Sequence, residues 1–196
     1  PAWLTAGRWR ALQAAGAAGP GLWCWHQHGW RHKNHAAAGK KNEFGPDRPA
    51  KAIQRDIRLG RRRLEGILGP AFAPVFTPPW NRCDERTAAI LADLGFRVIS
   101  RDGKTDAGCI RPAGHGLIAC DVTVDLHTVT DRDAAAAWER LFQNLAASLA
   151  AGCCGVMIHH QRMNPAAFDF LAHLLALVSS QKYIKLLHLG RAASYA

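Results

Sequence analysis

Four of the ten histidines of this chain lie within ten residues, between His26 and His35. They follow an apolar run, residues 22–25, that predicts the last part of a buried strand. Neutral imidazole is the commonest protein ligand for zinc and similar metals. His28 and His32, four residues apart just after this strand, therefore predict two imidazoles aimed at one metal ion. The alternative is a solvated, histidine-rich loop.

A third histidine of this stretch, His26, lies two residues before His28. Side chains two residues apart in a strand point to the same face. We therefore expect His26 to face the same interior as His28, either as a substrate-binding group or as a support for the metal ligands. His35 lies deeper in the following loop, and its place is left open.

Two further segments end in residues suited to proton transfer. The apolar run 156–158 leads into His159 and His160. A histidine held at a strand end beside a metal can act as a general acid, so we predict this role for His159, with His160 in support. Asp125 and His127 share a strand face, where a carboxylate can orient an imidazole. The alternatives are structural histidines and a surface pair.

The segment 77–82 reads Thr-Pro-Pro-Trp-Asn-Arg. Pro78 and Pro79 stiffen the backbone and remove two hydrogen-bond donors. Such a turn presents the indole of Trp80, which suits the wall of a sugar or acyl pocket. The alternative is a surface turn with a core tryptophan.

Helical and strand patterns alternate along the chain, and most neighbouring strands lack a hairpin signal between them. This order predicts a parallel α/β fold, in which sites assemble at the carboxyl ends of strands. The loop 29–48 is long enough to be functional or disordered, and residues 101–116 predict a glycine-rich loop. The expected helices are 3–18, 48–68, 84–94, 131–151 and 165–179, and the expected strands are 22–28, 74–77, 96–100, one or two within 117–127, 154–159 and 183–188.

Length and composition predict one soluble globular domain over residues 1–196, since the chain is 48% hydrophobic and 20% charged. No apolar run reaches the ~20 residues needed to cross a bilayer, so we expect no membrane partner. The net charge of +10 owes much to arginines of the expected helix 48–68. A solvated helix face explains them better than a nucleic-acid partner, because no nucleic-acid motif accompanies them.

The six cysteines form no C-x-x-C pair, and several lie in apolar runs. This pattern favours reduced, buried thiols and a cytoplasmic location over a disulfide framework. Neither a serine nucleophile elbow nor a P-loop is present. Oligomeric state and export are left open.

The motifs resemble those of the polysaccharide deacetylases, the NodB-homology domain of carbohydrate esterase family 4. Residues 28–32 resemble the family's His-[Ser/Thr]-x-x-His metal motif, residues 78–80 its Arg-x-Pro-aromatic motif, and residues 157–159 its Leu-x-His motif. The resemblance covers residues 1–189. It is closest to a divergent bacterial branch that carries Lys-Lys-x-Glu-Phe-Gly, here residues 40–45.

The resemblance implies a distorted (β/α) barrel of about seven strands. It also implies one divalent metal ion, expected to be zinc with nickel or cobalt as alternatives, and removal of acetyl groups from N-acetylated sugars or glycans. In the family the metal polarises the amide carbonyl and an Asp acts as base. The roles carried over are metal ligands for His28 and His32, general acid for His159, and substrate binding for Trp80, Pro79, Arg82 and His26. Asp125, His127 and His160 would support them.

Three departures from the family bear on activity. The family's Asp-Asp motif is absent, and we expect it to lie on a first strand that this sequence lacks. Thr77 stands where the family has Arg, so Arg82 is the expected substitute, and Gly29 replaces the hydroxyl residue. We therefore expect this chain alone to bind metal weakly and to turn over little. The alternatives are an inactive metal-binding or glycan-binding relative and a hydrolase of another amide or ester.

Overall fold

The computed structural model describes residues 4–16, 23–103, 109–126 and 133–194. These residues divide into two compact units, and each is described by itself. The first unit comprises Pro1–Asp102, Ile110–Asp121 and His188–Ala196, and the second comprises Gly103–Cys109 and Val122–Leu187.

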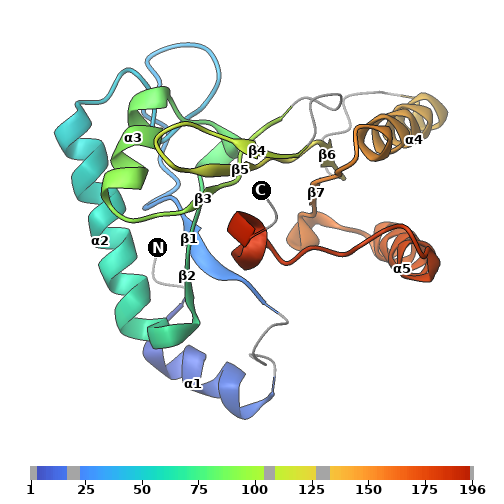
Figure 1. The fold of residues 1–196 in the computed structure, drawn as a ribbon, viewed down its shortest axis with the longest axis horizontal. Coiled ribbons are helices and arrows are strands. Elements are labelled where there is room, and N and C mark those ends of the chain that lie inside the picture. The colour runs from blue at the N-terminus through green and yellow to red at the C-terminus, as the bar shows by residue number, and fades with distance from the viewer. Residues whose placement is uncertain (1–3, 17–22, 104–108, 127–132, 195–196) are drawn as a thin grey trace. The chain divides into compact units, whose positions relative to one another are not determined.

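The first unit is built on a five-stranded sheet with the order β1-β2-β3-β5-β4 (Figure 1). Its first four strands in this order run parallel, and β4 pairs with β5 antiparallel. The tight β4–β5 connection needs left-handed backbone, which Gly114, His115 and Gly116 adopt. The strands are β1 (Trp25–His28), β2 (Phe72–Thr77), β3 (Val98–Ile99), β4 (Ile110–Pro112) and β5 (Ile118–Cys120).

Three helices belong to this unit: α1 (Ala6–Ala14), α2 (Ala50–Leu68) and α3 (Glu85–Asp93). Apolar residues of α2 recur at helical spacing, so Ile53 and Ile57 are fully buried while most of its arginines are exposed. Alternation along β2 sends Phe76 into the main core with α2 and α3. Val75 points to the other face, where it packs against the 3-10 helix η4 (Leu189–Ser194) through Ala192.

The second unit contains the parallel pair β6 (Val124–Asp125) and β7 (Val156–Met157) and the helices α4 (Ala134–Ala150) and α5 (Pro165–Ser180). A disulfide joins Cys109 to Cys153, 44 residues apart. The expectation of six reduced thiols was therefore wrong for this pair, although the other four cysteines are free.

The helices and most strands lie where the sequence predicts them, with two exceptions. The strand expected over 183–188 does not form; these residues are irregular and Tyr183 is 98% exposed. Conversely, β4 forms inside the expected loop 101–116. The α/β class and the mainly parallel sheet are confirmed, whereas closure into a barrel stays a prediction. Among the described residues, no helix has the length and apolar character to span a bilayer.

The cap of α3 gives a test of the fold. The Oδ1 atom of Asp84 accepts hydrogen bonds from the amide (2.9 Å) and the hydroxyl (2.8 Å) of Thr87. Burial works to raise the pKa of Asp84, but the bonds from Thr87 and Arg86 outweigh it, so this pKa lies below its usual value. We expect Asp84→Ala to lower the free energy of unfolding at pH 7 by about 1 kcal/mol.

The pH dependence of that loss follows from the depressed pKa. The stabilising contribution is complete above the unfolded pKa of about 4 and is lost as the pH falls through the folded value. Urea unfolding of both proteins at several pH values should therefore show a difference that shrinks below about pH 4. Asp93→Ala, at the exposed last turn of the same helix, is the control and should not destabilise the protein, because a negative charge there is unfavourable.

Candidate functional site

The carboxyl ends of β1 and β2 lie side by side, with His28 paired to Thr77 in the register of the sheet. The Nδ1 atom of His28 lies 3.1 Å from the backbone oxygen of Thr77. Because a carbonyl can only accept, Nδ1 carries the proton and the lone pair of the neutral ring is on Nε2. A histidine that binds zinc is usually oriented in this way, through a hydrogen bond from its other ring nitrogen.

The same threonine also holds His26. The imidazole of His26 donates from Nδ1 to the oxygen of Cys24 (2.9 Å), and its Nε2 accepts from the hydroxyl of Thr77 (2.9 Å). Burial lowers the pKa of His26, while the bond to the Cys24 carbonyl acts in the opposite direction. Both ring nitrogens are engaged inside the protein. The ring of His26 therefore links the ends of β1 and β2, and its expected role in substrate binding or in support of the metal ligands stays a prediction.

The rings of His28 and His32 lie close together at an inclined angle. Their centroids are 5.3 Å apart and their planes are inclined by 50°. Two imidazoles that share one tetrahedral zinc, with Zn–N bonds of about 2.0–2.1 Å, have centroids roughly 5 Å apart. The separation of the two rings is therefore that expected for two ligands of such a site. Within the described part of the chain, no group of three or more His, Cys, Asp or Glu side chains is arranged to hold a metal.

The turn from Trp30 to His32 is organised by a buried carboxylate, that of Glu43. Its Oε1 accepts from the amide of Arg31 (2.7 Å), and its Oε2 accepts from the amides of Trp30 and His32 (3.2 Å each). Glu43 is 1% exposed. Three backbone donors thus converge on one side chain of the long loop 29–48.

Gly29 begins this turn in left-handed backbone, with φ of +61°. A Cβ atom there would lie 2.5 Å from Oε2 of Glu43 and 2.5 Å from Cγ of the buried Pro79. No L side chain fits without displacing one of these groups. This is the physical reason for glycine at a position where the resembled motif has a hydroxyl residue. It also places Pro79 beneath the turn.

Trp80 follows in a 3-10 turn, η2 (Pro79–Asn81), and its indole contacts His32 edge-on with ring centroids 4.3 Å apart. His32, Trp80 and Asn81 all have positive φ, between 54° and 57°. Such conformations cost roughly 1–3 kcal/mol each and concentrate at functional sites. Arg82 points elsewhere: it reaches the backbone oxygen of Lys41 (3.4 Å) and lies 3.9 Å from Asp102.

In the second unit, Asp125 ends β6 beside β7, and its Oδ1 lies 3.5 Å from Nε2 of His159. The sequence predicted that the carboxylate of Asp125 orients His127, but His127 lies outside the described residues. The structure thus brings Asp125 to the predicted general acid. His160 is exposed and begins the short helix η3 (His160–Arg162).

Sequence reasoning assigned no function to Thr77, Glu43 or Asp121. Asp121 directly follows β5, is 1% exposed and binds Arg111 at 2.6 Å. Burial raises its pKa, against the opposing effect of Arg111. For Glu43 a signal existed, because it lies in the Lys-Lys-x-Glu-Phe-Gly segment, residues 40–45, next to Phe44. Thr77 gave none beyond its place at a strand end.

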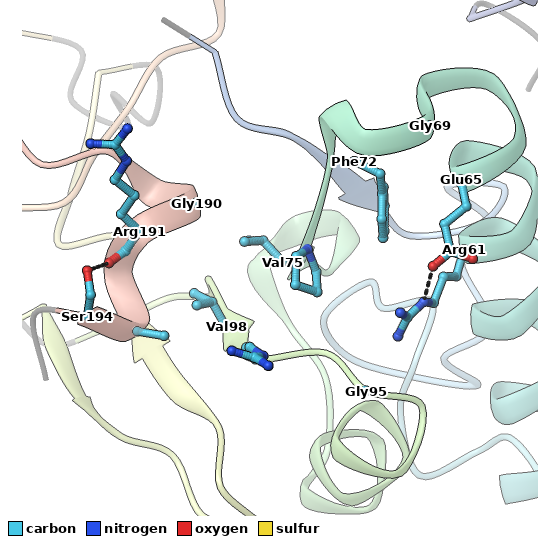
Figure 2. A pocket seen from close by; sticks show the side chains of 13 residues that line it. Arg61, Glu65, Gly69, Phe72, Val75, Gly95, Val98, Gly190, Arg191 and Ser194 are labelled. Carbon is cyan, nitrogen blue, oxygen red and sulfur yellow. Dashed lines mark hydrogen bonds and ion pairs between the residues drawn. The ribbon is translucent and has the colours of Figure 1, made fainter. Parts of the chain in front are cut away.

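A cavity of about 710 Å³ lies at the amino ends of β2 and β3 (Figure 2). It is lined by Phe72 and Val98, the first residues of β2 and β3, and by Arg61, which is paired with Glu65. His28 ends β1 beside the carboxyl end of β2, and His32 follows it, so this cavity is not part of the candidate site.

Comparison with known proteins bears on the fold. No family model matches the sequence, and no curated protein matches it. The solved structure of a protein from Mycobacterium smegmatis, provisionally named a polysaccharide deacetylase, is similar to this chain with a TM-score of 0.67 and 19% identity. The match covers 97% of this chain and 66% of that chain, so this chain spans just under two thirds of its length. The similarity shows that the fold is deacetylase-like.

The tight contacts of Gly29 predict the effect of adding one methyl group. We expect Gly29→Ala to lower the free energy of unfolding by about 2–4 kcal/mol, from left-handed strain together with overpacking. Gly39→Ala is a matched control in the same loop: its φ is +76°, but nothing lies within 4 Å of the added Cβ. It should cost about 1 kcal/mol. Equal losses in urea unfolding would show that Gly29 has room for a side chain.

Proposed function

We propose that this chain carries part of the site of a metal-dependent hydrolase that removes acetyl groups from an N-acetylated sugar or glycan. The observation that carries the proposal is the pair His28 and His32 at the carboxyl end of β1, with Nδ1 of His28 bonded to Thr77. The deacetylase-like fold supports it, as does the resemblance of the motifs at 28–32, 78–80 and 157–159. In this proposal the sheet is part of a distorted (β/α) barrel.

Nε2 of His28 and a ring nitrogen of His32 would hold the metal. When bound, a divalent metal supplies Lewis-acid polarisation of the acetyl carbonyl. Zinc is the first candidate because two imidazoles suit it, and nickel and cobalt accept the same ligands. Catalytic zinc sites have three protein ligands, and the resemblance implies an Asp as the third. With two histidines alone, we expect weak binding and little turnover.

Trp80 is the residue best placed to wall the acyl pocket, since its indole contacts the ring of His32. In the proposed reaction His159 protonates the leaving amine, and the carboxylate of Asp125 orients its imidazole. In this proposal His26 and Pro79 hold the carboxyl ends of β1 and β2 in place, His26 through Thr77 and Pro79 by packing against Gly29. Arg82 joins the loop 29–48 to Asp102.

A second candidate function is binding without turnover. The observation that favours it is the two-ligand set, because no group of three or more His, Cys, Asp or Glu in the described residues is arranged to hold a metal ion. A metal-binding or glycan-binding relative needs no catalytic base. Acetate release separates the two functions.

The first test is metal binding. We expect the chain to bind about one zinc ion weakly when titrated with zinc, and His28→Ala and His32→Ala each to bind it much more weakly but measurably, as determined by competition with a chromophoric chelator. His115→Ala, in the exposed β4–β5 turn, is the control and should bind as the wild type does. A wild-type protein that binds neither zinc, nickel nor cobalt would refute the metal site, and the hydrolase proposal with it.

A zinc-loaded protein is then assayed for acetate release from N-acetylated chitooligosaccharides and from other acylated amides and esters. Release that His28→Ala abolishes supports the hydrolase. Zinc and glycan binding without release of acetate or any other acyl group supports the binding function instead.

A further inference from the structure

The buried carboxylate of Glu43, within the Lys-Lys-x-Glu-Phe-Gly segment of the loop 29–48, has no role in the site described so far. The geometry points to Glu43 as a positioning residue for the metal site, acting through the backbone of His32. This inference rests on the proposed function, since it concerns how the two histidines are brought together. The carboxylate of Glu43 accepts hydrogen bonds from the amides that precede and carry the second histidine.

A buried carboxylate is costly unless its oxygens receive hydrogen bonds. Here both oxygens are used by consecutive amides, Trp30, Arg31 and His32, at 2.7–3.2 Å. Consecutive N–H groups converge in this way only when the backbone curls around the acceptor, a concave arrangement that favours an anion. The negative charge and the curled backbone therefore stabilise one another, and an acceptor with fewer lone pairs leaves some of the amides without a partner.

The curled turn determines where His32 points. Its φ of 54° is left-handed, which a non-glycine residue adopts only when its surroundings hold it there. In this conformation its ring lies 5.3 Å from that of His28 and 4.3 Å from Trp80. Loss of the hydrogen bond from the His32 amide to Glu43 removes a restraint on the backbone of His32, so the two rings will spend less time in a geometry that suits one metal ion.

Glu43 is itself anchored to the core. Its backbone oxygen accepts from Nη1 of Arg48 at 3.1 Å, and Nη2 of Arg48 forms a buried ion pair with Asp56 of α2 at 2.6 Å. The next residue, Phe44, is fully buried against Phe76 of β2. The position of the carboxylate is thus fixed by α2 and β2, and the position of the turn is fixed by the carboxylate.

The test is the zinc affinity of Glu43→Gln, measured by competition with a chromophoric chelator. The glutamine keeps the size of the side chain but sets an NH2 group against at least one of the three amides. We expect the affinity to fall about ten-fold or more, the range for residues that orient metal ligands. Asp47→Asn is the matched control: Asp47 accepts from the amide of Ala37 (3.1 Å) in the same loop but is exposed, and it should leave zinc affinity unchanged.

Two further measurements separate positioning from general destabilisation. In a His32→Ala background, Glu43→Gln should have no further effect on residual zinc affinity, because Glu43 acts through His32. Hydrogen exchange should speed up at the amides of Trp30–His32, while that of β2 stays as in the wild type. An equal loss of affinity in both backgrounds, or wild-type affinity in Glu43→Gln, overturns the inference alone. Failure of the wild type to bind zinc overturns the proposed function as well.

Discussion

The parallel pairing of β1 with β2, in the register that sets His28 beside Thr77, is the constraint on which the candidate site depends. Thr77 serves both neighbouring histidines, with its carbonyl toward His28 and its hydroxyl toward His26. A shift of one residue would send each side chain to the opposite face of the sheet. Buried Gln27 opposes such a shift, because its amide donates to the carbonyls of Gly29 and of α2.

Beyond the strand end, buried charges define the path of the chain. In the loop 29–48 the buried ionic groups are Glu43 and Arg48. The carboxylate accepts from three amides, and the guanidinium donates to Asp56 and to a backbone carbonyl. Buried ionic groups of this kind contribute less to net stability than to the choice of one conformation, since any other arrangement leaves a charge unpaired. These polar groups therefore favour a single path for the long loop.

Much of the fold could be predicted from the sequence because its helices carry local signals. The cap at Asp84 and the spacing of Ile53 and Ile57 require no knowledge of distant residues. Strands depend on neighbours that local patterns do not reveal. The apolar run 183–188 read as a strand, but it has no pairing partner among the described residues, while the short β4 forms only because β5 lies beside it. The disulfide likewise joins cysteines 44 residues apart.

For the site, residue types at strand ends predicted His28, His32 and Trp80, which the structure places together at the end of the first unit's strands. The residues that hold them could not be found in this way. Thr77 acts partly through its backbone carbonyl, which any residue has, and Glu43 acts by receiving amides that converge only after the chain has turned. Such roles depend on the folded path of the backbone, which the identity of a single residue does not reveal.

The way the loop 29–48 closes on itself has an evolutionary consequence. The amide of His35 bonds to the oxygen of Asn42, and the side chain of Asn34 accepts from the amide of Asn42 in return. Between these closing bonds the chain forms an exposed tip, residues 37–41. Insertions at this tip need not disturb the hydrogen bonds that hold the turn from Trp30 to His32. The tip is therefore a segment where related proteins can acquire new surface contacts without a change in the turn from Trp30 to His32.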